Sequence, residues 1–136
     1  MAVDPSKQCQ LIIVTPEAEV FDASIRGAIL PAHDGQYGVL GNHAPFLIKL
    51  GAGPLEIDDA DGGKQTYYVE GGVAQMKDNK LTVLTDDALT PDKIDKAKTT
   101  ADLEAAIAVE AHSDAEQELK AERMQRARAK LALVGV

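Results

Sequence analysis

The chain has 136 residues, a formal net charge of −8 and an apolar content of 45%, which fits one or two small folded domains and excludes a disordered chain. The acidic balance argues against nucleic acid as the main partner, because phosphate binding needs a basic surface. No run of about 20 apolar residues predicts a membrane span, and the N-terminus lacks the pattern of a secretory signal, so we expect a soluble protein that reaches a membrane only through partners.

The one cysteine of the chain, Cys9, cannot form an internal disulfide, and its presence fits a reducing compartment. It lies next to the apolar run of residues 11–14. We therefore interpret Cys9 as a small buried hydrophobic residue rather than a reactive thiol.

The first 87 residues favour β-structure, because short apolar segments alternate with turn signals. Pro16 and Pro31 are expected to end the strands that precede them. The expected strands include residues 8–14, 19–21, 24–30, 46–50, 54–57, 66–70, 73–76 and 81–85. About nine such short strands predict an antiparallel sandwich or barrel.

Residues 29–47 are the densest patch of glycine and proline in the sequence. Gly35, Gly38 and Gly41 recur at every third position, and Pro31 and Pro45 flank them. Glycine serves where the backbone approaches another group closely or needs a positive φ, and proline serves where a strand ends. The pattern predicts a long, fixed and exposed loop between two buried strands, which is typical of a binding surface.

The apolar period changes at Asp86. Thr90 followed by Pro91 predicts the start of a helix, with threonine as the N-cap and proline at the first helical position. No glycine or proline follows up to residue 110, so the helix is expected to reach that point. Its expected apolar stripe consists of Ile94, Ala97, Ala101, Ala105 and Ala108.

A second helix is expected from Ser113, because Ser113 and Glu116 have the spacing of a capping box. This helix is expected to end near Leu133. Its apolar stripe consists of Met124, Ala127, Leu131 and Val134. With a connection of two or three residues, the two helices would form an antiparallel hairpin.

We therefore predict an N-terminal β domain, a sandwich or a barrel, over residues 1–87 and a C-terminal antiparallel αα hairpin over residues 88–136. The first part carries 6 basic and 13 acidic residues, a net charge of −7, and the second carries 8 basic and 9 acidic residues, a net charge of −1. Because an alanine-lined stripe buries little area, we expect the hairpin to be held loosely and to leave its docking site at a cost of only a few kcal/mol.

Four basic residues of the second helix recur at spacings of three, three and four residues, which places them on one face: Lys120, Arg123, Arg126 and Lys130. Such a face would suit an acidic partner, since several charges together steer association and select the partner. The alternative is a solvated face that nearby glutamates partly neutralise, because single exposed ion pairs stabilise by only about 0–1 kcal/mol.

A metal site or a catalytic centre is not expected. His33, Asp34 and His43 are residue types that bind metals, but they lie in a glycine-rich stretch where no helix or strand is predicted to fix their spacing. Ser24 and Cys9 are predicted to lie in strands, without the adjacent base that a nucleophile needs. A metal-dependent hydrolase that uses His33 and His43 is the enzyme alternative.

Four motifs give the sequence its resemblance to a known family. They are PAHDGQYGVLGNHAP at residues 31–45, GAGPL at 51–55, YVEGGVA at 68–74 and LTVLTDDA at 81–88. In this order, and followed by a helical hairpin, they resemble the epsilon subunit of the F-type ATP synthase, called delta in mitochondria. The resemblance covers nearly the whole chain.

The resemblance implies a flattened β-sandwich of about ten antiparallel strands followed by a two-helix C-terminal domain. It implies a non-catalytic subunit of the rotor's central stalk, bound to the gamma subunit and to the ring of c subunits, with no required cofactor. In a bacterium, such a subunit would lie at the cytoplasmic face of the inner membrane and touch the membrane only through the complex. The alternative outside this family is a free-standing binding module.

Site residues carry over by position. In the family the glycine-rich loop faces the c ring, which points to Asp34, Gly35, Gln36 and Tyr37, and His43 would lie near the gamma contact. Many relatives have an acidic residue at the position of Gln36 and a proline at the position of Gly41, so the polar contacts here would differ from theirs.

In bacterial members of the family the hairpin can extend along gamma and block rotation in the direction of ATP hydrolysis. The second helix then presents basic side chains to acidic segments of the alpha and beta subunits. The face formed by Lys120, Arg123, Arg126 and Lys130 matches that role.

Some members bind ATP as a regulatory ligand in the docked hairpin, through an Ile/Leu-Asp-x-x-Arg-Ala motif on the first helix. The corresponding residues here begin with Ile94 and Asp95, and Lys98 replaces the arginine, which removes its fixed fork of donors. Arg126 and Lys130 fall where the second helix contributes basic groups. ATP binding is therefore a hypothesis for this chain.

Overall fold

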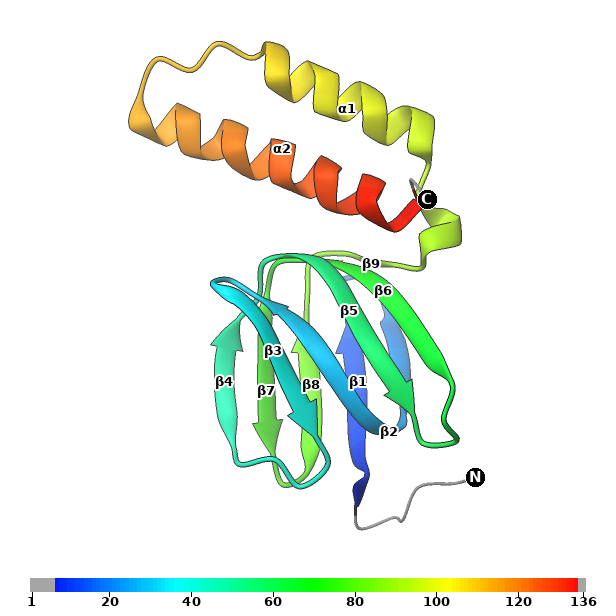
Figure 1. Cartoon of the computed structure of the whole chain (residues 1–136). Helices are drawn as coiled ribbons and strands as arrows, with labels where there is room; N and C mark the ends of the chain where they lie inside the picture. Colours follow the sequence, from blue (N-terminus) through cyan, green and yellow to red (C-terminus); the bar gives the residue numbers. More distant parts are fainter. Residues whose placement is uncertain (1–6, 135–136) are drawn as a thin grey trace.

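Within residues 7–134, which the computed structural model describes, nine strands precede two α-helices (Figure 1). The strands are β1 (Cys9–Val14), β2 (Glu19–Ala32), β3 (Gly35–Leu40), β4 (Phe46–Lys49), β5 (Ala52–Asp59), β6 (Lys64–Glu70), β7 (Val73–Lys77), β8 (Lys80–Leu84) and β9 (Ala88–Leu89). A 3₁₀ turn, η2 (Pro91–Lys93), connects them to α1 (Lys96–Ala108) and α2 (Asp114–Val134). The predicted β-sandwich followed by a helical hairpin is confirmed.

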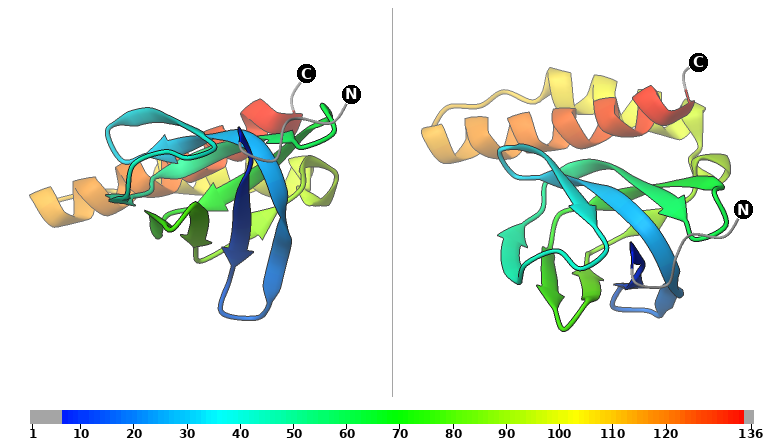
Figure 2. Two further views of the ribbon diagram at one scale, coloured as in Figure 1. Left: turned by 90° about the horizontal axis from the view of Figure 1, so that it is seen from below. Right: turned by 60° about the horizontal axis from the view of Figure 1, so that its bottom comes forward.

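The strands pair in the order β4-β7-β8-β1-β2-β5-β6-β9, and β3 pairs with β2. All pairs are antiparallel except β1 with β8. The segments predicted as two strands, residues 19–21 and 24–30, belong to the single strand β2, which has 14 residues. Its first part pairs with β1 and its later part pairs with β3 and β5, as both views in Figure 2 show.

A register shift explains how β2 serves both halves of the sheet. The pairing of β2 with β5 shifts between Ile25 and Gly27, and such a bulge bends a strand and increases its twist. At Gly27 a Cβ atom would lie 2.8 Å from the backbone oxygen of Val39, so the strands meet too closely there for a side chain.

Large aliphatic side chains fill the space between the layers. Among the fully buried residues are Leu11, Ile13, Leu55 and Leu81, each of which contributes about 1.5–3 kcal/mol on leaving water. Cys9 is 3% exposed in the same core, which confirms its interpretation as a buried hydrophobic residue. Burial raises the pKa of its thiol.

The glycine-rich stretch is mostly a β-hairpin, so the prediction of a long loop between the strands of residues 24–30 and 46–50 was wrong. β2 continues through Pro31 to Ala32, a turn covers residues 33–34, and β3 begins at Gly35. Pro31 is tolerated inside the strand because Pro31 and Gln36 form a pair without hydrogen bonds between β2 and β3. The missing N–H of proline therefore breaks no hydrogen bond to β3. Irregular backbone is limited to residues 41–45, between β3 and β4.

The first helix differs from its prediction at both ends and on its buried face. Thr90 and Pro91 begin only η2, and α1 starts later, where the Asp95 side chain accepts a hydrogen bond from the Lys98 N–H at 3.0 Å. The predicted alanine stripe is exposed after Ile94. The buried face instead carries Thr99, partly buried Leu103 and Ala106, at positions i, i+4 and i+7. Ile94, from which the predicted stripe was counted, lies before α1 and does not fix which face of the helix is buried.

The second helix follows its prediction. The N–H of Glu116 donates to Ser113 Oγ at 3.1 Å, and Glu116 accepts in return from the N–H of His112 at 2.7 Å. The predicted stripe is confirmed, since Ala127 is buried and the other three members are partly buried. The connection between the helices is longer than predicted and covers residues 109–113.

The hairpin docks on the sandwich through its second helix. α2 contacts β5, β6 and η2, whereas α1 packs on α2 (Figure 1). β9 pairs with the end of β6, through Tyr68 opposite Leu89 and Val69 opposite Ala88, so the sheet continues two residues past the predicted boundary at residue 87. None of the helices within residues 7–134 has the length and apolar content to cross a bilayer.

Candidate functional site

The residues predicted to face the c ring lie at and after the turn between β2 and β3. Asp34, Gly35 and Gln36 are exposed there, and Gly35 has a φ of 144°, which favours glycine. The turn precedes β3, whereas His43 lies in the irregular segment that follows β3.

A cluster of rings joins Tyr37 to His43. The ring centroids of Tyr37 and His43 are 5.8 Å apart, and Phe46 lies 5.0 Å from Tyr37 and 5.1 Å from His43. His43 Nδ1 lies 2.7 Å from the carbonyl oxygen of Ala44. The predicted site therefore divides into an exposed turn and a partly buried ring cluster.

The enzyme alternative has no support in this arrangement. His33 lines a cleft between the sandwich and α2, whereas His43 belongs to the ring cluster. No group of three or more histidine, cysteine, aspartate or glutamate side chains within residues 7–134 is placed to hold a metal ion.

The basic residues of α2 do not form one free face. Lys120 is partly buried and lies near the connection between the helices. The other three line a shallow cleft of about 170 Å³ between the hairpin and β6, whose lining residues are Glu70, Thr99, Asp102, Arg123, Arg126, Ala127 and Lys130.

Two of these cations contact β6. Arg126 Nε lies 3.9 Å from Glu70 Oε1, with side chains that are 44% and 21% exposed. The Nζ atom of Lys130 lies 5.2 Å from the centre of the Tyr68 ring, a distance at which a cation is attracted to a ring face. Arg126 and Lys130 thus contact β6 from α2.

Tyr68 and Glu70 form the sandwich side of this contact. The Tyr68 hydroxyl donates a hydrogen bond to Glu70 Oε1 at 3.1 Å. Burial, and then the negative charge of Glu70, raise the pKa of Tyr68, so the hydroxyl keeps its proton and remains a donor. Next to Arg126 on α2, Gln125 Nε2 donates to the carbonyl oxygen of Ala52 at 2.6 Å.

Sequence reasoning missed Tyr68, Glu70 and Gln125 as docking residues. Glu70 is the only acidic residue in the motif YVEGGVA, but a motif does not tell which helix will lie over it. Because the partners are more than 50 positions apart along the chain, only the fold brings them together.

The hypothetical ATP residues are only partly brought together. Arg126 and Lys130 line the small cleft, but Ile94, Asp95 and Lys98 do not. Ile94 is buried before α1, and Asp95 caps that helix through the Lys98 N–H. The cleft is smaller than the roughly 300–1,000 Å³ of typical ligand pockets.

Comparison with known proteins identifies the family. Residues 8–91 match the family described as ATP synthase, Delta/Epsilon chain, beta-sandwich domain. The ATP synthase epsilon chain of Synechococcus sp. (strain JA-2-3B'a(2-13)) is 40% identical over 119 residues, which cover 86% of this chain and 86% of that protein. The chain belongs to the ATP synthase delta/epsilon family.

The relation to this family extends into the helical hairpin. The ATP synthase epsilon chain of Rippkaea orientalis (strain PCC 8801 / RF-1) is 35% identical over 131 residues, which cover 93% of this chain and 96% of that protein. The epsilon chain of Rhodopirellula baltica (strain DSM 10527 / NCIMB 13988 / SH1) is 32% identical over 120 residues, 88% of this chain and 93% of that protein.

Solved structures share the fold of this family member. A chain of the Euglena gracilis mitochondrial ATP synthase, OSCP/F1/c-ring in rotational state 1, gives a TM-score of 0.82 at 22% identity, covering 96% of this chain and 82% of that chain. A chain of the Tetrahymena thermophila mitochondrial ATP synthase central stalk/c-ring gives a TM-score of 0.68 at 18% identity, covering 90% of this chain and 93% of that chain.

Proposed function

We propose that this chain is a non-catalytic rotor subunit in the central stalk of a bacterial F-type ATP synthase, where it couples the gamma subunit to the c ring. It would lie at the cytoplasmic face of the inner membrane. The observation that carries the proposal is the relation to bacterial epsilon chains over both the sandwich and the hairpin. The fold shared with chains of two ATP synthase assemblies supports it.

The sandwich is the part that we expect to bind the rotor. The exposed turn at Asp34, Gly35 and Gln36, together with Tyr37, would meet the c ring, and His43 would lie near gamma. The exposure of the turn and the fixed ring cluster of Tyr37 and His43 support these roles.

The hairpin is the part that we expect to regulate. It would leave the sandwich, extend along gamma and restrain ATP hydrolysis by contacting the alpha and beta subunits. Its docking through partly exposed polar contacts supports a division into two domains near residue 89, and a partner could shift the hairpin only by binding one of its two positions better.

Deletion of residues 90–136 tests both parts, because it leaves β9 in place. We expect the shortened chain to copurify with gamma and the c ring, and the resulting complex to hydrolyse ATP faster than the complex with the full chain. A free-standing binding module would bring down no rotor subunits, even as the full chain. Unchanged hydrolysis would show that the hairpin does not inhibit.

ATP is a second hypothesis, supported only by the convergence of Arg123, Arg126 and Lys130 on one cleft. The carboxylates of Glu70 and Asp102 line the same cleft and would repel a triphosphate. Calorimetric titration of the protein with MgATP tests this hypothesis, and the absence of heat at millimolar nucleotide would remove it.

A further inference from the structure

The pairing of β3 with β2 fixes which backbone groups of β3 point away from the sheet. In an antiparallel pair, residues alternate between hydrogen-bonded positions and positions whose N–H and C=O point outward. Pro31 has no N–H, and its carbonyl oxygen accepts from the Gly51 N–H at 2.8 Å on the other side of β2. Its partner Gln36 must therefore direct its own N–H and C=O away from β2.

The same alternation places Gly38 and Leu40 with Gln36 on the outer edge. Within residues 7–134, β3 pairs only with β2. The carbonyl of Leu40 accepts from the His43 N–H at 3.2 Å, but the N–H and C=O groups of Gln36 and Gly38 have no partner in that part of the chain. All three residues are exposed.

This edge lacks the features that normally protect a sheet edge. Exposed edge strands are usually blunted by lysine, by proline or by a bulge, because unpaired backbone groups invite another strand. β3 has the sequence GQYGVL and no irregularity in its pairing with β2. The edge is thus both open and regular.

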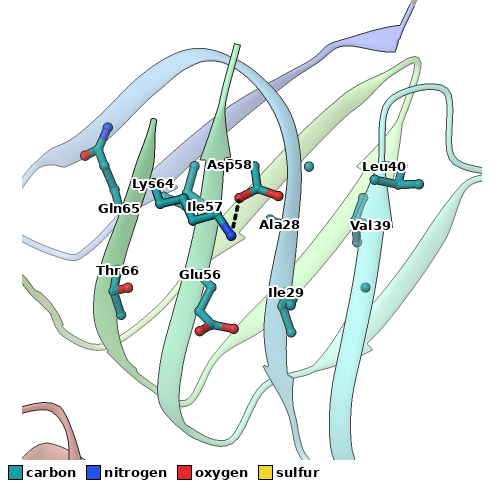
Figure 3. Close-up of a pocket in the computed structure, with 12 residues that line it drawn as sticks. Ala28, Ile29, Val39, Leu40, Glu56, Ile57, Asp58, Lys64, Gln65 and Thr66 are labelled. Atoms are coloured by element: carbon teal, nitrogen blue, oxygen red, sulfur yellow. Dashed lines mark ion pairs between the residues drawn. The ribbon is translucent and has the colours of Figure 1, made fainter. Parts of the chain in front are cut away.

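A hollow with apolar side chains at its β2–β3 end and polar side chains at its β5–β6 end lies beside the same edge, on the outer face of the sheet. It has a volume of about 440 Å³ and is lined by residues of β2, β3, β5 and β6. Figure 3 shows Ile29 and Leu40 at its β2–β3 end and the Lys64–Asp58 ion pair across β5 and β6. Ile29 and Leu40 are 39% and 68% exposed. A Cβ at Gly38 would meet no atom within 4 Å.

We propose that β3 receives an extended segment of a partner rotor subunit as an added strand. The segment would pair with the outward N–H and C=O groups of Gln36 and Gly38. A side chain opposite Gly38 would lie over that glycine, beside Ile29 and Leu40, so the segment carries an apolar residue there. This inference rests on the proposed function and replaces side-chain recognition by Gln36 with main-chain recognition.

A second copy of this chain is the weaker occupant. The six residues of β3 offer only three outward positions, and one short strand pair buries far less than the roughly 1,200–2,000 Å² of a stable interface. A rotor subunit that already contacts the sandwich elsewhere does not depend on this small area alone, because the strand pairing adds to its other contacts.

Two substitutions at one position separate main-chain from side-chain recognition. Gln36→Pro removes the outward N–H, and Gln36→Ala removes only the side chain and keeps the N–H. Binding of the labelled full chain is measured on ATP synthase depleted of this subunit, and both variants are checked for native circular dichroism. We expect Gln36→Pro to bind about tenfold more weakly, and Gln36→Ala to bind within about twofold of the unaltered chain.

Equal binding by all three chains, or equal weakening by both variants, would overturn the added strand while leaving the proposed function intact. If the unaltered chain itself fails to bind the depleted complex, the proposed function falls instead. Sedimentation of the isolated chain should show a monomer, and a dimer that Gln36→Pro dissociates would assign the edge to a second copy.

Hydrogen exchange of the unaltered chain gives a test that needs no variant to fold. We expect the Gln36 and Gly38 amides to exchange at least tenfold more slowly in the reassembled complex than in the free chain, because the added strand accepts their hydrogens. The amide of Glu17, in the turn between β1 and β2, is the control. Unchanged exchange at both Gln36 and Gly38 would contradict the proposal.

Discussion

The sandwich and the hairpin bury different kinds of side chain. In the sandwich, large aliphatic residues such as Leu11, Ile13 and Leu81 have no exposed surface. In the two helices, the buried residues are Thr99, Ala106 and Ala127. Since the stabilisation grows with the apolar area removed from water, the sandwich is a firm base and the hairpin a lightly held addition.

The contacts between the two regions are also of a different kind. Polar groups supply several of them, through the Arg126–Glu70 ion pair and the Gln125 hydrogen bond to Ala52. Partly exposed ion pairs contribute little and are screened by salt. The comparison teaches that a surface can fix the position of a hairpin without holding it strongly, as the proposed regulatory role would require.

The largest expected effect comes from the sandwich core. Leu81→Ala should lower the free energy of unfolding by about 2–5 kcal/mol, because it removes a fully buried side chain and leaves a cavity. Leu119→Ala, at a position that is 61% exposed on α2, should change it by less than about 0.5 kcal/mol. Urea unfolding followed by circular dichroism compares the two variants. Similar losses of unfolding free energy would contradict the difference in burial between the sandwich and the hairpin.

A charge at the buried alanine of α2 should release the hairpin. Ala127→Asp places a carboxylate where the side chain is 5% exposed, and undocking avoids the cost of burying it. We expect amides in α2 to exchange at least tenfold faster while urea unfolding of the sandwich stays unchanged. Ala132→Asp, on the exposed side of the same helix, is the control. Loss of the sandwich together with the hairpin would show one inseparable unit.

The Glu70 carboxylate should have a smaller effect. Glu70→Gln removes the charge that faces Arg126, and we expect docking to weaken by about 1 kcal/mol or less because Arg126 is partly exposed. Amide exchange in α2 measures this, and its difference from the unaltered chain should shrink as NaCl rises. Glu17→Gln, at an exposed glutamate, should change nothing, and a salt-independent effect of Glu70→Gln would argue against an ion pair.

The last comparison distinguishes the cations of α2 from one another. Joint replacement of Arg126 and Lys130 by alanine should loosen docking, because both contact β6. Joint replacement of Lys120 and Arg123 should leave docking unchanged and, under the proposed function, weaken the inhibition of ATP hydrolysis by a few fold. Amide exchange and ATPase assays on the reassembled complex give the two readouts. If both double variants changed docking and inhibition to the same extent, the four residues would act as a single basic face.

Periodicity and capping signals predicted the sandwich and α2 well. The stripe through Met124 and Ala127 and the capping box at Ser113 follow from spacing alone, because local geometry decides them. α1 was placed too early because Thr90 and Pro91 fit a helix start equally well when they begin only a single turn. The predicted stripe was counted from Ile94, which lies before the true cap at Asp95, so it named the wrong face.

The candidate sites were less predictable, since they depend on pairing between distant segments. Glycines at residues 35 and 38 suggested a loop, but strand β3 uses them at an open edge, where the pairing with β2 decides the orientation. The role of Arg126 depends on Glu70, which reaches it only after β6 and α2 are packed. Charge spacing on a helix shows which residues share a face and leaves open what that face meets.

Native-state hydrogen exchange of the intact chain tests the difference between the two regions most directly. We expect the amides of α2 to exchange through a local opening that costs only a few kcal/mol, while amides of β1 and β8 exchange only through unfolding of the whole sandwich. If the α2 amides and the β1 and β8 amides report the same opening free energy, the hairpin is part of the sandwich core and the account is contradicted.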